Sequence, residues 1–238
     1  MIIAVAVCPS PPLLIPELTG AQQVASELRN ACLSAVAELT GALPDLIAVV
    51  GAAERTKTWN GAATLDLAAY APKAQRIAAS DAPDRGPASL PSALGVGTWL
   101  LGQAGWQASR VLQSVAHDEP PLRCADIGAR LAALPGRVAM LVMADGSARR
   151  GLKAPGYFDE RSAGFDAETE HAVRTGELGA LLSADPALAR DLMATGRPAW
   201  QVLAGALGGR KVSSEVRYRD DPFGVAYLVA SLRVRPEP

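Results

Sequence analysis

The stretch Ile2-Ile3-Ala4-Val5-Ala6-Val7-Cys8-Pro9-Ser10-Pro11-Pro12 opens the chain and determines what can follow it. Residues 2–7 are continuously apolar and rich in β-branched side chains, which is typical of a strand buried on both faces. The proline-rich segment that continues to Gly20 is neither regular helix nor central strand, because proline lacks the N–H and restrains the residue before it. The chain therefore begins with a central strand that ends in an irregular loop.

The next segments alternate between helix and strand patterns. From Gln22 to Gly41, apolar residues recur at steps of three and four, which predicts a helix with one buried face that ends at Gly41. Residues Leu46–Val50 and Val138–Met143 are short apolar runs, as in buried strands. Strand, loop, helix and strand in this order are typical of an α/β sheet.

The remaining segments extend the same pattern to the end of the chain. We expect further helices at Ser92–Gln103, Ala125–Leu134, Ala167–Arg174 with Asp166 as its N-cap, from Asp185-Pro186 onward, and at Trp200–Leu207. We expect further strands at Ser109–Val115, Val212–Tyr218 and Gly224–Val234, and a surface excursion at Tyr70–Pro91. No internal repeat or linker divides the chain. We therefore predict that residues 1–238 form a single three-layer α/β domain, with a central, mostly parallel, mixed-edge sheet flanked by helices.

Composition excludes several classes of function. The chain has 238 residues, 49% of them hydrophobic, and a formal charge of -1, which describes a compact globular protein and not a nucleic-acid binder. Its apolar runs are broken well before about 20 residues, so we expect no membrane span, and the N-terminus does not resemble a signal peptide. The cysteines Cys8, Cys32 and Cys124 are odd in number and far apart, so neither a disulfide framework nor a zinc site is indicated. We expect a cytoplasmic protein.

Three motifs carry a resemblance to a known family. They are Cys8-Pro9-Ser10-Pro11-Pro12-Leu13-Leu14-Ile15-Pro16, Met143-Ala144-Asp145-Gly146-Ser147-Ala148-Arg149-Arg150 and Asp221-Pro222-Phe223-Gly224-Val225-Ala226-Tyr227-Leu228-Val229. Together they resemble the class III extradiol ring-cleavage dioxygenases of the LigB-like superfamily, over nearly the whole chain. The resemblance implies a LigB-like fold and an oxidoreductase ancestry.

The same resemblance implies an iron site that this sequence does not supply. Family histidines are expected at Ser10, near Ala52 or Ala53, and at Ala148, and a carboxylate ligand is expected within residues 196–200, where there is no Asp or Glu. Fe(II) in such enzymes needs two imidazoles and one carboxylate. Only His117 and His171 occur in the chain, the first after a predicted strand and the second within a predicted helix. We therefore interpret the protein as a divergent member without a metal or cofactor, with Fe(II) as the alternative.

Four residues near the former iron position are candidates for chemistry. Cys8 could act as a thiolate, although a small buried hydrophobic residue is the simpler interpretation. Ser10 and Ser147 could meet in the former site and hold a polar ligand, or they could instead stabilise turns. Asp145 is the fourth candidate, because it follows a buried strand.

Charged residues after two strands indicate a ligand site. They are Glu54, Arg55 and Lys57 in one loop and Arg149, Arg150 and Lys153 in another, with Tyr157 nearby. Ligands of open α/β sheets bind at the carboxyl ends of strands, where we expect these two loops to face one another. Arginine binds carboxylate or phosphate through two parallel hydrogen bonds, so a small anionic molecule is the expected ligand. Solvated surface loops are the alternative for each residue taken singly.

Three hypotheses about function remain open at this point. The first is a pocket that has lost iron and binds, or acts without iron on, a small anionic or aromatic metabolite. The second is an active metal-dependent dioxygenase or other metalloenzyme with relocated ligands, drawn from Cys8, Glu54, Asp145 and His117. The third is a non-catalytic subunit of a homo- or hetero-oligomer. In none of them is nucleic acid or a membrane an expected partner.

Overall fold

β1 (Ile2–Cys8) lies inside a seven-stranded sheet of the order β3-β4-β2-β5-β1-β7-β6. The structure is a computed structural model that describes residues 1–19, 25–59 and 89–235. The other strands are β2 (Leu46–Ala53), β3 (Lys57–Trp59), β4 (Arg110–Ala116), β5 (Val138–Met143), β6 (Val212–Asp220) and β7 (Tyr227–Val234). The four inner strands β4, β2, β5 and β1 are parallel, and antiparallel strands flank them on both sides. This mostly parallel sheet with mixed edges confirms the predicted fold class.

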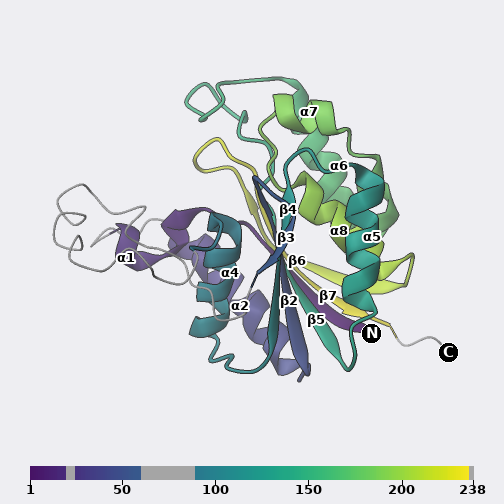
Figure 1. Ribbon diagram of the computed structural model, residues 1–238. Helices are drawn as coiled ribbons and strands as arrows, with labels where there is room; N and C mark the ends of the chain where they lie inside the picture. Colours follow the sequence, from purple (N-terminus) through teal and green to yellow (C-terminus); the bar gives the residue numbers. More distant parts are fainter. Residues whose placement is uncertain (20–24, 60–88, 236–238) are drawn as a thin grey trace.

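Helices cover both faces of the sheet (Figure 1). On one face lie η1 (Pro12–Leu14), α1 (Pro16–Thr19), α2 (Ser26–Gly41) and α4 (Ser92–Gln103). On the other lie α5 (Pro121–Ala132), α6 (Arg161–Thr175), η3 (Leu178–Ser183), α7 (Pro186–Asp191) and α8 (Arg197–Leu207). Two separate apolar clusters result, one on each side of the sheet. The inner strands are buried on both faces, which explains their continuous apolar sequences.

Close contact between two helices on the second face depends on glycine. Gly128 of α5 and Gly205 of α8 lie where the two helices approach each other. A methyl group at Gly128 would be 2.1 Å from the carbonyl oxygen of Val202, and one at Gly205 would be 2.3 Å from that of Ala125. Only residues without a Cβ allow this approach, so these two glycines set the spacing of the helices.

Several predicted boundaries agree with the structure, and a few differ. Ser92–Gln103 and Val138–Met143 have the predicted bounds, and Asp185 is an N-cap that accepts a hydrogen bond from the Ala187 N–H. The prediction that Asp166 caps a helix is wrong, because α6 begins five residues earlier at Arg161 and includes Asp166. The physical reason is that its carboxylate binds Ser147 instead of a helix end.

Other differences concern the second strand and its surroundings. β2 continues to Ala53, beyond the predicted end, and Lys57 belongs to the unpredicted edge strand β3 and not to a loop. The predicted excursion Tyr70–Pro91 lies outside the described residues up to position 88. Among the helices that the structure describes, none is long and apolar enough to cross a bilayer.

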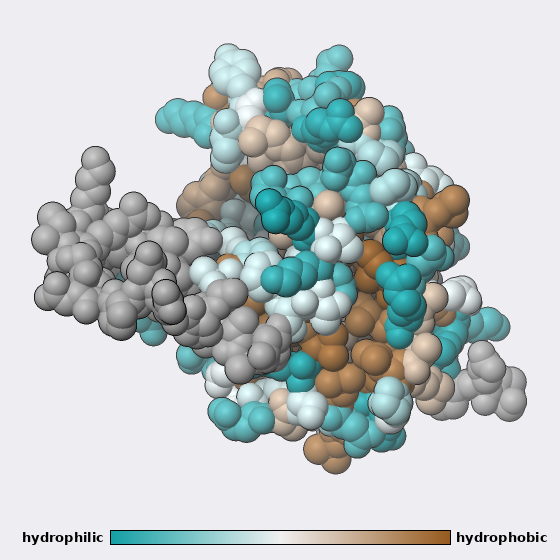
Figure 2. Space-filling model, viewed as in Figure 1, coloured by the Kyte–Doolittle hydropathy of each residue, from teal (hydrophilic) through white to brown (hydrophobic). Residues whose placement is uncertain are grey.

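The carboxyl ends of the parallel strands share one end of the sheet. β1, β2, β4 and β5 run in the same direction, so the segments after Cys8, Ala53, Ala116 and Met143 emerge together. In Figure 2 this upper end is mainly hydrophilic, whereas apolar surface gathers lower on the same face, between α4 and α5. The polar end is therefore the place where a ligand site is expected.

Candidate functional site

A cavity of about 670 Å³ opens at the carboxyl ends of the parallel strands, and we call it the Ser10 cavity. Its walls come from the segments after β1, β2, β4 and β5, from the start of α4 and from the residues before α8. The lining residues are Ser10, Pro11, Pro12, Ala52, Ala53, Glu54, Arg55, Trp59, Ser89, Leu90, Pro91, Ser92, Ala93, His117, Met143, Asp145, Thr195 and Gly196. Its position matches the rule that ligands of α/β sheets bind outside the carboxyl ends of the strands.

Ser10 and Asp145 form a pair in the wall of this cavity. The Ser10 backbone N–H donates to Asp145 Oδ1 at 2.9 Å, and the Ser10 hydroxyl donates to Oδ2 at 2.7 Å. The pair forms because β1 and β5 are adjacent and parallel, so the loops that follow them lie side by side. Gly196, which precedes α8, donates its N–H to the Asp145 carbonyl oxygen and so holds the loop from a third side.

The electrostatic environment of Asp145 is unusual for a carboxylate. Burial raises the pKa of Asp145, and the two hydrogen bonds from Ser10 oppose this rise without cancelling it. Its charge also contributes to the raised pKa of Cys32 and of Tyr227, although burial or the Cys8 contact has the larger effect on each. Asp145 is thus largely desolvated, and the raised pKa values of Cys32 and Tyr227 favour the uncharged form of each.

Trp59 provides an aromatic part of the lining of this cavity. Its indole N–H donates to the Ser114 hydroxyl at 2.9 Å, and the Lys57 ammonium lies 4.3 Å from the ring centroid. The Ser114 hydroxyl in turn donates to the Arg55 carbonyl oxygen at 2.7 Å. This chain of contacts holds β3 against the end of β2, so the indole is fixed in place.

Glu54, Arg55 and His117 also line the cavity. The side chains of Glu54 and Arg55 are exposed, and His117 Nε2 lies 4.0 Å from Glu54 Oε1. His117 is supported from behind by Arg197, a buried residue of α8 that donates to the His117 carbonyl oxygen and, at 2.6 Å, to that of Glu119. The cavity therefore combines a charged wall, an aromatic wall and the Ser10–Asp145 pair.

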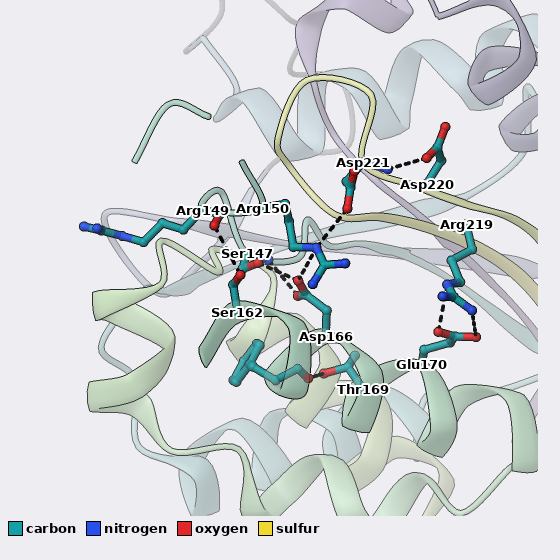
Figure 3. Close-up of polar contacts among 11 residues, drawn as sticks. Ser147, Arg149, Arg150, Ser162, Asp166, Thr169, Glu170, Arg219, Asp220 and Asp221 are labelled. Carbon is teal, nitrogen blue, oxygen red and sulfur yellow. Dashed lines mark hydrogen bonds and ion pairs between the residues drawn. The ribbon is translucent and has the colours of Figure 1, made fainter. Parts of the chain in front are cut away.

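A second cavity, of about 450 Å³, lies between α6 and the β6–β7 hairpin, and we call it the Arg150 cavity. It contains a second serine–aspartate pair, in which Ser147 donates its N–H at 2.9 Å and its hydroxyl to the Asp166 carboxylate (Figure 3). Arg150 Nε lies 3.8 Å from Asp166 Oδ2 and 2.9 Å from Asp221 Oδ2. Burial raises the pKa of Asp166, and Arg150 opposes that rise.

The cations expected to share one pocket lie in different places. Arg55 lines the Ser10 cavity and Arg150 lines the Arg150 cavity, and Figure 3 shows the Arg149 side chain pointing away from the Arg150 group. Lys57 packs on Trp59, and Lys153 is exposed. The segment from Asp145 to Ser147 separates the two cavities, because Asp145 lines the first and Gly146 the second.

The other predicted site residues are also placed by the structure. Ser10 and Ser147 do not meet, because each binds its own aspartate. Cys8 is fully buried and packs in the apolar cluster on the α2 face, which favours the interpretation as a small hydrophobic residue. Tyr157 is 63% exposed, and its backbone is left-handed with φ of 62°.

The arrangement is unsuited to hold a metal through the candidate ligands that the sequence offers. Glu54, His117 and Asp145 line the same cavity, yet in the described part of the chain no three His, Cys, Asp or Glu side chains converge as a metal site. Ser10 is already bound to Asp145, and Ala52 and Ala53 offer no donor atom in their side chains. His171 lies on α6 with an exposed side chain.

Three residues that shape this end of the molecule are not evident as site residues from the sequence. Trp59 resembles a core or interface residue there, and neither Arg197 nor Asp166 is assigned to a site. Arg197 precedes a proline at a helix start, which signals a helix boundary and not a buried cation. Only the contact between α8 and the segment after β4 reveals its role.

Comparisons with known proteins give a fold and no activity. No protein-family model matches the chain, and no curated protein matches it. Among solved structures, the chain is similar to the crystal structure of an uncharacterized protein, JW3007, from Escherichia coli K12. The TM-score is 0.53 with 14% sequence identity, over 97% of this chain and 99% of that one. At this identity the likeness shows a shared fold alone.

Proposed function

We propose that the protein binds a small aromatic molecule in the Ser10 cavity without iron, as a divergent relative of the LigB-like extradiol dioxygenases. The single observation behind this proposal is the Ser10–Asp145 pair. It occupies the place where the resemblance expects an iron-binding histidine, and both Asp145 oxygens are engaged by Ser10. A serine hydroxyl that donates to a carboxylate is a poor ligand for Fe(II), which is usually held by two imidazoles and one carboxylate.

The remaining walls support binding of an aromatic ring. Trp59 offers an immobilised indole, and Pro11 and Pro12 add apolar surface. A volume of about 670 Å³ is within the usual range for small-molecule pockets, about 300–1,000 Å³. Offset or edge-to-face contact with an aromatic ring contributes about 0.5–1.5 kcal/mol beyond the burial of its area.

The charged residues of the cavity argue against the expectation that its ligand is a small anion held by cations from both loops. Arg55 is the cation that lines this cavity among the described residues, and Glu54 is adjacent to it, with Asp145 in the same wall. The three arginine and lysine side chains of the later loop, Arg149, Arg150 and Lys153, do not line it in the structure. We therefore propose an aromatic ligand and do not extend the proposal to an anion.

A binding experiment in the presence of a metal chelator tests this proposal. Benzamide, as a neutral aromatic probe, is titrated into the protein with excess EDTA, and binding is followed by calorimetry and by tryptophan fluorescence. We expect binding that EDTA does not weaken. Ala52→Phe, which fills the Ser10 cavity, should abolish it, whereas Ala163→Phe in the Arg150 cavity should not.

Two results would contradict the proposed iron-free binding site. Binding that appears only after Fe(II) is added anaerobically, or one tightly held metal ion per chain after purification without chelators, would contradict an iron-free site. Turnover of a bound aromatic molecule and assembly into a homo-oligomer both stay predictions, and product analysis and size measurement in solution respectively address them.

A further inference from the structure

The two serine–aspartate pairs of this protein differ in one respect. Ser10 and Ser147 each donate a backbone N–H and a hydroxyl to the two oxygens of an aspartate. Beside Asp166 of the second pair, Arg150 supplies a cation 3.8 Å away. Beside Asp145 of the first pair, no cationic side chain lies within ion-pair distance in the parts of the chain that the structure describes.

Asp145 is nevertheless accessible from the Ser10 cavity. It is partly exposed and lines the cavity together with Ser10, whereas the groups behind it are buried. Each carboxylate oxygen accepts one hydrogen bond from Ser10 and has capacity for another. Asp145 therefore borders the space in which a ligand would lie.

We infer that the ligand of the Ser10 cavity carries a cationic hydrogen-bond donor, a protonated amine or amidine, which lies beside Asp145 as Arg150 lies within ion-pair distance of Asp166. This inference rests on the proposed function, since it names the polar group of the same aromatic ligand. Charge-assisted hydrogen bonds are roughly twice as strong as neutral ones, and more so away from bulk water. An organic cation thus gains a charge-assisted hydrogen bond at this carboxylate, which a neutral or anionic analogue cannot form.

The other groups around Asp145 are consistent with a cation. On α2 and β7 its neighbours are Cys32 and Tyr227, and burial favours the uncharged form of each. At the ends of β2 and β4, Glu54 and Arg55 have opposite charges and His117 lies near Glu54. Arg55 is exposed, so its charge is screened by solvent more than the charge of Asp145.

Three probes of nearly the same shape test the inference. Benzamidine is cationic, benzamide is neutral and benzoate is anionic, and their dissociation constants are measured by calorimetry at pH 7.5. We expect benzamidine to bind at least tenfold more tightly than benzamide, and benzoate to bind more weakly than both. Ala52→Phe should abolish binding of benzamidine, whereas Ala163→Phe should leave it unchanged.

Two variants at the pair separate charge from structure. Asp145→Asn preserves the shape of the side chain and removes its charge. Benzamidine and benzamide should therefore bind this variant with nearly equal dissociation constants. Ser10→Ala removes the hydroxyl that lowers the pKa of Asp145, so the preference for benzamidine should shrink and should recover as pH is raised. Thermal unfolding of each variant establishes that it is folded before binding is interpreted.

The possible failures distinguish this inference from the proposed function. If benzamide binds in the Ser10 cavity and benzamidine binds no better, the inference is wrong and the proposed function stands. If benzamidine retains its preference in Asp145→Asn, or loses it in Ala163→Phe but not in Ala52→Phe, another acidic group binds the cation and the inference is wrong. If Ala52→Phe affects none of the three probes, both proposals fail together.

Discussion

Ser10 binds both carboxylate oxygens of Asp145 across 135 positions of the chain, through its backbone N–H at 2.9 Å and its hydroxyl at 2.7 Å. The two residues follow adjacent parallel strands, so a change at either one affects the loops of both β1 and β5. The same pairing holds the Asp145 carboxylate where it is partly exposed to the cavity but largely desolvated, and this desolvation raises its pKa. The free energy of unfolding therefore depends on whether Asp145 is protonated, and this dependence can be measured by varying the pH.

Replacing Asp145 with Asn should change how stability depends on pH. Because the pKa of Asp145 is raised in the folded protein, the folded state holds its proton more tightly than the unfolded chain. The stabilisation from this group is complete below the unfolded pKa, about 3.9, and is lost as pH rises through the folded pKa. The stability of the native protein relative to Asp145→Asn should thus fall as pH rises above about 4.

Urea unfolding at several values between about pH 4.5 and 7.5 measures this difference. Asp166, whose pKa is also raised, is present in both proteins, so its effect cancels to first order. A native protein that gains stability over the variant as pH rises would mean that the folded state favours the charged form of Asp145.

Replacing Gly128 with Ala should strongly destabilise the protein. The added methyl group would lie 2.1 Å from the Val202 carbonyl oxygen and 2.5 Å from the Ala206 nitrogen, so α5 and α8 would have to separate. We expect a loss of about 3 kcal/mol, the upper end of what overpacking usually costs. Guanidinium unfolding of the purified variant measures it.

Gly164→Ala is the matched control for this helix substitution. Gly164 lies in α6, is exposed and has no atom within 4 Å of the added methyl group. Alanine is the better helix former, so this variant should gain about 0.5–1 kcal/mol. Equal losses in both variants would show that contact between α5 and α8 does not control the effect.

Replacing Arg197 with Met should destabilise the segment that carries His117. Arg197 donates to the backbone carbonyl oxygens of His117 and Glu119 and, at 2.7 Å, to Gln201 Oε1. Methionine would leave these acceptors without a donor, at a cost of about 2–4 kcal/mol in the free energy of unfolding. Arg190→Met, at an exposed position of α7, should change it by less than about 0.5 kcal/mol. Similar unfolding midpoints for the two variants would show that the buried contacts of Arg197 contribute little.

The three cysteines should be unreactive in the folded protein. Cys8, Cys32 and Cys124 are free and fully buried, and burial raises the pKa of Cys124 to about 11. Since the thiolate is the reactive form, a chromogenic disulfide reagent at about pH 8 should react slowly with native protein and with all of these thiols in guanidinium. Rapid reaction of one thiol without denaturant would reveal an accessible cysteine and contradict this burial.

Local sequence pattern predicts the elements of this fold well where one signal dominates. β5 and α4 have the expected bounds, because a short apolar run and a flanking proline are strong local signals. The prediction that Asp166 is an N-cap is wrong because a contact with a distant segment, and not a local signal, determines its position. An acidic residue before a helical pattern suits an N-cap, and no local signal shows that Ser147, 19 positions earlier, binds its carboxylate.

The candidate site was predictable only in part. The expectation that polar residues after β1, β2 and β5 gather at one end of the sheet follows from parallel strands, and Ser10, Glu54, Arg55 and Asp145 do line one cavity. The sequence did not reveal that Arg149 and Arg150 lie away from this cavity. Their direction depends on the turn at residues 145–147, which is held by backbone contacts and by the two serine–aspartate pairs.

The sequence by itself determined the mostly parallel sheet with helices on both faces, the absence of histidine at position 10, and the burial of the strands, because these depend on residue type and local periodicity. The tertiary structure alone decided that Asp145 is bound by Ser10 without a neighbouring cation among the described residues, while Asp166 is bound by Ser147 beside Arg150. Hydrogen bonds between segments distant in the chain depend on how strands are ordered in the sheet. That order is a property of the whole fold, and no stretch of the chain carries it alone.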